Sequence, residues 1–191
     1  MLRNLSYSAI VLRVKASGES NRDAWFLTAE EGIIRATHFG GPKSRLRSQI
    51  APFHQGRLLI YHDPVRDSRK VSDFEVQSWR PGIRELYERL MAADAVAETI
   101  LASYGSGGSW PEAAELTGAA LDSLETADAA ACSRTFALFL CRWVKILGLT
   151  PDHFGSFDED IEISRLEQAR AYSQTALARV LGKRLPTWDW I

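Results

Sequence analysis

The sequence lacks the features that mark a membrane protein or a secreted protein. Only 2 of its 191 residues are cysteine, and no run of about 18 apolar residues occurs. The opening stretch MLRNLSYSAIVLRVK has no signal-peptide pattern, because its apolar residues alternate with polar ones and no small-residue cleavage site follows. We therefore expect a cytoplasmic protein with no membrane partner.

Familiar catalytic motifs are also missing. There is no Walker sequence, nucleophile elbow, HExxH or paired CxxC. Cys132 and Cys141 are nine residues apart, which on one helix places them on opposite sides, so we expect two buried free thiols. The acidic run 158-DEDIE-162 lacks the glycine and the oxygen spacing of a calcium loop. The sequence predicts no catalytic residue and no cofactor.

Metal binding is not indicated by the histidines either. His38, His54 and His62 all fall in the N-terminal region, where a zinc site is conceivable. They lack close spacing, however, and no cysteine is near them. We expect three surface or half-buried histidines and no metal.

Acidic residues are absent from the long interval between Glu31 and Asp63. Five cations fall in that interval, most densely in 40-GGPKSRLRSQIAPF-53. Residues 1–80 contain 13 Lys and Arg against 8 Asp and Glu, whereas residues 81–191 carry a net charge of −6. This asymmetry favours nucleic acid or another polyanion as the partner of the first part, over an ordinary solvated loop.

Residues 1–80 show the period-2 pattern of β-strands. In 8-SAIVLRVK-15, strict alternation places Ile10, Leu12 and Val14 on one face and Val11, Arg13 and Lys15 on the other. The predicted strands are 8–15, 24–28, 33–39, 57–62 and 71–79. Five short strands, with a helix or long connection before the fourth, predict an OB-type barrel over 1–80.

Residues 81–191 show helical periodicity, and Pro81-Gly82 marks the change. Helices are predicted from Ile83 to about residue 101, then over 111–124, 128–147 and 164–181, with Gly182 ending the last one. Residues 136–148 are apolar around most of the helix circumference, which predicts the centre of a bundle. The predicted fold class is α+β, with an all-helical second domain over 81–191.

Two groups of side chains are candidates for binding. Lysine and arginine on a barrel could neutralise phosphates, and the candidate DNA-binding residues are Arg13, Lys15, Arg22, Arg35, Lys43, Arg45, Arg47 and Arg57. Aromatic rings either stack on bases or fill the barrel core, and the rings in question are Trp25, Phe39, Phe53 and Tyr61.

The predicted central helix carries the second group. Arg142 and Lys145 are three residues apart and share a face. They form either a structural pair with neighbouring acids or an anchor for an acidic peptide, with Phe139 and Trp143 as apolar walls. In the terminal 186-PTWDWI-191, the roles of Trp188 and Trp190 stay open.

The order of these motifs resembles that of the bacterial RecO recombination-mediator family. The similar stretches are 18-GESNR-22, 28-TAEEGIIRA-36, 42-PKSRLRSQIAPF-53, 139-FLCRWVKILGLTPD-152 and 177-LARVLGKRLPTWDW-190. The resemblance implies an N-terminal OB-fold and a helical C-terminal domain. It also implies binding of single- and double-stranded DNA, strand annealing, recombinase loading, and a nucleoid-associated location. The implied protein partners are RecR and the acidic C-terminal tail of single-strand-binding protein, and no catalytic residue is implied.

The chain departs from that family in two places. Many members carry a four-cysteine zinc module after the Leu-Gly of the central helix, whereas here only about 15 residues, with no cysteine, separate Gly148 from the last predicted helix. We therefore expect the zinc module to be absent. The residues 38-HFGG-41 also replace a family stretch rich in cations, which implies weaker DNA binding or more reliance on partners.

Overall fold

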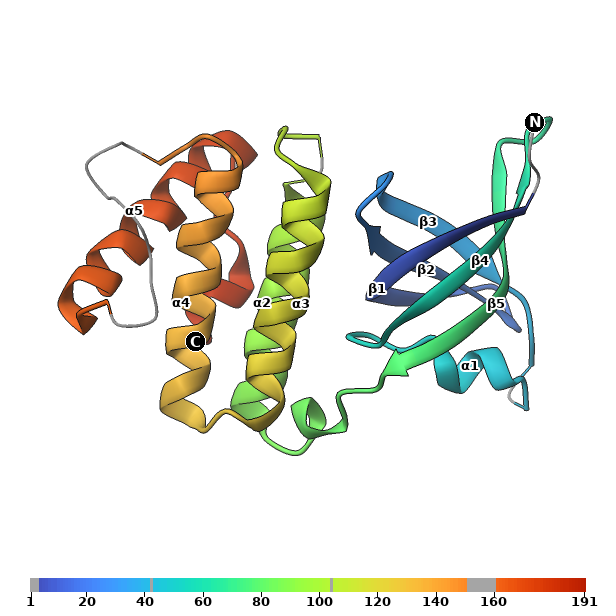
Figure 1. The fold of residues 1–191 in the computed structure, drawn as a ribbon, viewed down its shortest axis with the longest axis horizontal. Coiled ribbons are helices and arrows are strands. Elements are labelled where there is room, and N and C mark those ends of the chain that lie inside the picture. The colour runs from blue at the N-terminus through green and yellow to red at the C-terminus, as the bar shows by residue number, and fades with distance from the viewer. Residues whose placement is uncertain (1–3, 42, 104, 151–160) are drawn as a thin grey trace. The chain divides into compact units, whose positions relative to one another are not determined.

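The computed structural model describes residues 4–41, 43–103, 105–150 and 161–191. The chain forms two compact units, Met1–Arg80 and Pro81–Ile191. The first is a β-barrel and the second is helical (Figure 1), which confirms the predicted α+β class. Within the described ranges, no helix combines the length and apolar content that crossing a bilayer requires.

The first unit is a closed five-stranded barrel in the order β1-β2-β3-β5-β4. Its strands are β1 (Asn4–Ser17), β2 (Asn21–Thr28), β3 (Gly32–His38), β4 (Gln55–Asp63) and β5 (Ser68–Ser78). Neighbours pair antiparallel except β3 and β5, which meet in parallel through Thr37 and Lys70. Apart from β3, the strands are longer than predicted, because pairing with neighbouring strands extends the ladders beyond the alternating apolar segments.

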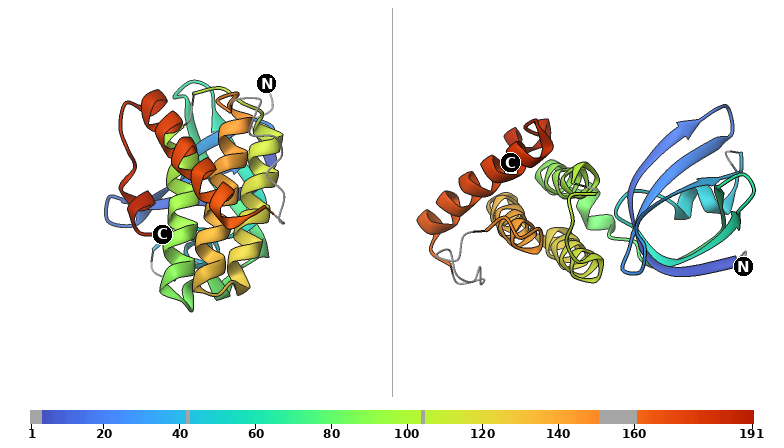
Figure 2. Two further views of the ribbon diagram at one scale, coloured as in Figure 1. Left: turned by 90° about the vertical axis from the view of Figure 1, so that its left-hand side faces the viewer. Right: turned by 90° about the horizontal axis from the view of Figure 1, so that it is seen from above.

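A short helix, α1 (Arg45–Gln49), occupies the connection before β4, as the sequence predicts. It covers one end of the barrel, and in the view from above it lies inside the outline of the strands (Figures 1 and 2). Ile50, directly after α1, is fully buried in the barrel core, and Leu46 packs against that core. The basic segment is therefore anchored to the barrel by apolar side chains rather than being a free loop.

The barrel core consists of the inward-facing side chains of all five strands. Its buried members are Tyr7, Ala9, Val11, Ala24, Phe26, Ile34, Ala36, Ile50, Leu58, Ile60, Val71 and Phe74. Gly56 lets β4 approach β5 closely, since a Cβ atom there would lie 2.1 Å from the carbonyl oxygen of Glu75. The opposite faces carry polar and charged side chains, together with Ile10 and Leu27, which are buried but do not belong to this core.

The second unit packs α2 (Tyr87–Ala102), α3 (Trp110–Thr126) and α5 (Ile163–Leu181) around α4 (Ala129–Ile146). As predicted, α4 is the central helix, and both cysteines on it are buried free thiols whose pKa values are raised by burial.

The predicted start of the first helix of this unit was wrong. Pro81–Arg84 forms a separate 3₁₀ turn, so α2 begins at Tyr87 rather than at Ile83. Gly182 has φ +66° and ends α5 as expected.

The C-terminal segment packs back onto the helices. Trp188 is 1% exposed, and its indole nitrogen donates to Oγ1 of Thr99 at 3.0 Å. Trp190 remains largely exposed. The region where a zinc module would fall, 151–160, and most of the acidic run 158–162 lie outside the described residues.

Candidate nucleic-acid interface

The eight predicted cations all lie on the barrel unit, but the barrel separates them into three groups. The first group is Arg13 and Lys15 on β1 with Arg35 on β3. The second lies at the end of β3 and around α1, and consists of Arg22, Lys43, Arg45 and Arg47. The third is Arg57 on β4. On β1, the position that pairs with Arg57 is Ser8, five residues or about 17 Å from Arg13. The structure therefore does not gather all eight into one patch.

Arg13, Trp25 and Arg35 form a row across the outer face of three adjacent strands, here called the outer row. Arg13 pairs with Trp25 in the β1–β2 register, and Trp25 pairs with Arg35 in the β2–β3 register. The guanidinium carbon of Arg35 lies 5.3 Å from the centroid of the Trp25 ring, which is cation–π contact distance. A cation thus lies on each side of one aromatic ring.

A β-bulge at Leu12 creates this row. Val11 pairs with Phe26, and both face the core, whereas Arg13 pairs with Trp25 on the outside. The register shifts between Val11 and Arg13, so the extra residue reverses the alternation of side chains. The strict alternation predicted for this strand, with Val11 and Arg13 on one face, is therefore wrong. Without the bulge, Arg13 would point into the barrel core.

Arg35 is not a free cation. Its Nη2 donates to Oδ2 of Asp23 at 2.5 Å, and the hydroxyl of Thr37 donates to Oδ1 of the same carboxylate at 2.6 Å. Burial alone would raise the pKa of Asp23, but the hydrogen bonds from Arg35 and Thr37 outweigh it and lower that pKa. Asp23 is therefore ionised at neutral pH and offsets the charge of Arg35.

Two more of the predicted cations have acidic partners from distant positions in the chain. Nη2 of Arg45 lies 3.0 and 3.1 Å from the two carboxylate oxygens of Asp73. Arg57 pairs with Glu75 across β4 and β5, with Nη1 4.0 Å from Oε2. The interval between Glu31 and Asp63 is acid-free in sequence, but β5 and β2 bring carboxylates to it in space.

The other five predicted cations form no ion pair within the described part of the chain. They are Arg13, Lys15, Arg22, Lys43 and Arg47, here called the unpaired cations. A cation without an acidic partner can neutralise a phosphate without first breaking an ion pair. The unpaired cations are therefore the stronger candidates for phosphate contacts.

His38 lies among several charges at the end of β3. It pairs with Arg22 in the β2–β3 register, is 0% exposed, and neither ring nitrogen has a hydrogen-bond partner among the described residues. Burial, together with the nearby charges of Arg22 and Arg47, lowers the pKa of His38, while Asp23 acts in the opposite direction. The imidazole is therefore neutral at pH 7, and the local field at this barrel end is positive.

His54 also differs from expectation, whereas His62 does not. His54 is 5% exposed and shares a hydrogen bond at Nδ1 with the carbonyl oxygen of Gln49, so the surface or half-buried placement predicted for His38 and His54 was wrong. His62 is half-buried as expected, next to Asp67. In the described ranges, no group of three or more metal-ligating side chains is assembled.

A second aromatic–cation pair lies beside β3. Phe39, just past the end of the strand, is 47% exposed, and Nζ of Lys70 lies 5.4 Å from its ring centroid. Phe53 is buried, Trp25 and Tyr61 are half-buried, and Phe39 is exposed. Trp25 and Phe39 each have a cation beside the ring. Lys70 was not among the predicted cations, because the parallel bridge to Thr37, which brings it to this place, cannot be predicted from local pattern.

The four candidate partner-binding residues on α4 separate onto different sides of the helix. Phe139 and Arg142 line a hollow of about 530 Å³ between α3 and α4. Trp143 is 1% exposed, and its indole nitrogen donates to Oγ of Ser103 in the core. Lys145 is exposed. The structure therefore assigns Trp143 a packing contact, and does not bring the four together.

Arg134 is the cation that the sequence reasoning missed in this hollow. Arg134, Leu138 and Arg142 follow at four-residue spacing, so they form one ridge of α4 about 12 Å long. Leu116 and Ala119 of α3 line the opposite wall. The arrangement is an apolar groove with a guanidinium near each end, and the i, i+4 spacing is the sequence signal that could have identified it.

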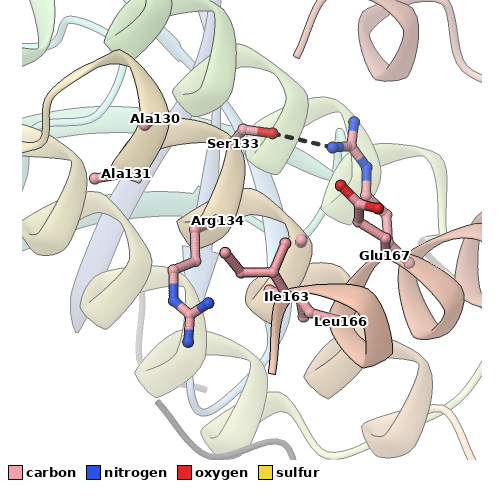
Figure 3. Close-up of a pocket in the computed structure, with 9 residues that line it drawn as sticks. Ala130, Ala131, Ser133, Arg134, Ile163, Leu166 and Glu167 are labelled. Carbon is pink, nitrogen blue, oxygen red and sulfur yellow. Dashed lines mark hydrogen bonds between the residues drawn. The ribbon is translucent and has the colours of Figure 1, made fainter. Parts of the chain in front are cut away.

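A second hollow, of about 450 Å³, lies between α4 and α5 (Figure 3). Arg170 is held there by several contacts: it donates to Oγ of Ser133 at 3.1 Å and to the carbonyl oxygen of Ile191, and it lies over the Phe136 ring. Arg134 lines this hollow as well and donates to the carbonyl oxygen of Ile161 at 3.1 Å. The guanidinium groups here bind the unit's own backbone.

Residues 1–78 match the sequence family described as Recombination protein O N terminal. The match covers the barrel unit. The barrel unit is therefore similar to the N-terminal part of Recombination protein O.

Three curated proteins named DNA repair protein RecO are also similar to parts of this chain. The DNA repair protein RecO of Pelotomaculum thermopropionicum is 35% identical over 94 residues, 48% of this chain and 36% of that protein. RecO of Thermosynechococcus vestitus is 24% identical over 163 residues, 83% of this chain and 58% of that protein. RecO of Bifidobacterium animalis subsp. lactis is 32% identical over 93 residues, 48% and 38% of the two chains. The chain thus matches between about a third and somewhat over half of the length of these RecO proteins.

Proposed function

We propose that this chain acts in DNA repair and homologous recombination by binding DNA through its barrel unit. The observation that carries the proposal is the set of unpaired cations on an OB-type barrel. Barrels of this type are a fold that binds oligonucleotides. The names of the RecO relatives agree with this role. Both single- and double-stranded DNA are substrates, since phosphate neutralisation does not depend on base pairing.

The proposed mechanism is electrostatic and makes or breaks no covalent bond. Cations of the barrel screen the phosphates of two strands, so that complementary bases approach and pair. In this mechanism the protein promotes annealing and, with RecR, assists the loading of recombinase. No catalytic residue has a role in it.

The test is a binding series with single- and double-stranded oligonucleotides at about 50 and about 200 mM salt. Simultaneous replacement of Lys43, Arg45 and Arg47 with alanine is expected to weaken binding and to flatten the salt dependence by about 0.7 for each lost contact to a single strand. If the affinity of the triple variant at low salt is unchanged, these three residues do not contact DNA.

The alternative function is a protein-interaction adaptor with little direct DNA binding. The groove between α3 and α4 favours it, because an apolar floor with Arg134 and Arg142 suits an acidic peptide. The acidic tail of single-strand-binding protein is the proposed ligand.

Charge reversal separates the two functions. Arg142→Glu is expected to abolish binding of an acidic tail peptide while leaving DNA affinity unchanged, and Lys145→Glu, on the exposed side, is the matched control. Tail affinity that survives Arg142→Glu would exclude the groove. Binding of RecR or the tail without measurable DNA affinity would favour the adaptor over the proposed function.

A further inference from the structure

We propose that Arg35 and Trp25, fixed by Asp23, form a stacking platform for an unpaired base, which makes the outer face of β1–β3 selective for single-stranded DNA. This inference rests on the proposed function, because it assumes that the barrel binds DNA. It assigns Arg35 a different role from the phosphate contact that its charge alone indicates.

The position of Asp23 explains why Arg35 is a poor phosphate contact. The Asp23 side chain is 10% exposed and lies directly beside the guanidinium, so the positive charge of Arg35 is already offset. A phosphate would have to compete with this carboxylate at 2.5 Å and would be repelled by it. Arg35 therefore contributes little to counterion release.

The same contact makes Arg35 a suitable stacking surface. Asp23 holds the guanidinium in place beside Trp25, with 5.3 Å between the guanidinium carbon and the ring centroid, while the Arg35 side chain remains 64% exposed. Arginine planes and aromatic rings are the surfaces on which proteins stack unpaired bases. A fixed platform also loses less side-chain entropy when a base binds.

The surroundings of the platform fit a nucleotide chain. Arg13 lies in the same row, and Lys15 lies opposite Asp23 in the β1–β2 register. Both side chains are exposed and belong to the unpaired cations, so phosphates can contact them beside the platform. Phe39 with Lys70 follows about 13 Å further along β3, four residues after Arg35. A strand that runs along β3 thus meets two aromatic–cation pairs in succession.

Duplex DNA cannot use this platform in the same way. Its bases are stacked on each other, so their faces are covered and only phosphates and groove edges reach the protein. Single strands expose base faces, and each base stacked on a protein ring contributes about 1–3 kcal/mol, equivalent to about a 5- to 150-fold change in affinity. Loss of the platform should therefore affect single strands only.

The test compares the wild-type 191-residue chain with Arg35→Lys and Trp25→Ala. Lysine keeps the charge and can still pair with Asp23, but it lacks the planar guanidinium. Affinities are measured for a fluorescent oligothymidylate of about 16 nucleotides, the upper site size of one OB-fold, and for a duplex of equal length. Each variant is expected to lose about 5-fold or more in single-strand affinity, with the duplex affinity and both salt slopes unchanged.

Two outcomes overturn the inference while leaving DNA binding intact. One is single-strand affinity that Arg35→Lys does not change, and the other is an equal loss for single strand and duplex. Arg35→Lys keeps the test decisive even if Trp25→Ala disturbs the fold, because the Arg35 side chain is exposed and lysine conserves its charge. A wild-type chain that binds neither probe would refute the proposed function itself, which is a different result.

Discussion

The arginines of the barrel unit and those of the helical unit have different partners. On the barrel, Arg35, Arg45 and Arg57 pair with carboxylates from other parts of the sheet, and the five unpaired cations form no ion pair with described residues. Arg80, at the end of this unit, is the exception, because it is buried and donates to the carbonyl oxygen of Phe53. In the helical unit, Arg89, Arg134 and Arg170 donate to backbone carbonyl oxygens of the same unit. The difference shows that the number of cations is a poor guide to a binding surface. The partner of each cation decides whether its charge serves the fold or a ligand.

The largest expected effect is on the helical unit and concerns stability. The guanidinium of Arg89 is 18% exposed and donates to the carbonyl oxygens of Ala127 at 2.6 Å and Gly82 at 3.1 Å. Arg89→Ala leaves both carbonyls without this donor and is expected to cost about 2–3 kcal/mol in free energy of unfolding. Denaturant unfolding followed by helical circular dichroism measures it.

The matched control is Arg179→Ala, at an exposed position of α5 for which the structure shows no side-chain partner among the described residues. Its expected effect is within about 0.5 kcal/mol. Neither variant should alter the salt slope of DNA binding. If Arg89→Ala changes the salt slope of DNA binding, the helical unit's arginines do not serve the fold alone, and the distinction between the two units is wrong.

A smaller effect is expected for the pH dependence of the barrel. The folded-state pKa of His38 is lowered, so the unfolded chain binds the proton more readily and stability falls as pH drops below about 6.5, by at most about 1.4 kcal/mol per pH unit. The pKa of Asp23 is lowered too, but its effect appears only at more acidic pH, below the ordinary aspartate range. The denaturant midpoints at about pH 7 and about pH 5.5 therefore isolate His38.

His38→Leu supplies the comparison for that experiment. It removes the buried titratable group and is expected to abolish this part of the acid-induced loss, with little cost at pH 7 because neither ring nitrogen has a hydrogen-bond partner in the described ranges. Identical pH profiles for wild type and variant would contradict the assignment. A flattened profile in the variant would show that protonation of His38 causes this part of the loss of stability.

The smallest effect is expected from releasing a paired cation. Asp73→Asn removes the carboxylate partner of Arg45, whose side chain is 72% exposed. Arg45 can then contact a phosphate, and the salt slope for single strands should steepen by up to about 0.7. A binding series at several salt concentrations detects this change. No change would mean that Arg45 lies outside the interface, whether paired or not.

The sequence predicted the order of strands and helices and the central position of α4, because these follow from local periodicity and turn residues. It could not predict the bulge at Leu12, which reverses the faces of Arg13 and Lys15 and depends on pairing with β2. It also could not predict that Asp73 lies beside Arg45, 28 positions away. Pairing across strands decides both, and an alternating pattern contains no information on it.

The helical unit gives a similar lesson. The spacing of Arg142 and Lys145 predicts a shared face of α4, but Arg142 lines the groove with α3, whereas Lys145 is exposed. Trp143 between them belongs to the core contact with Ser103. Helical spacing does not identify what packs on a face. The apolar pattern of 136–148 does not indicate Arg134, which lies before that segment on the same helix.

The most direct test of the central claim is the salt dependence of single-strand binding in two barrel variants. Lys43→Ala/Arg47→Ala removes two unpaired cations, and Arg45→Ala removes one cation that is paired with Asp73. The predicted slope decreases by about 1.4 in the double variant and stays close to the wild-type value in Arg45→Ala. A decrease of about 0.7 in Arg45→Ala, or no decrease in the double variant, would contradict the claim that ion pairing selects the DNA-binding cations.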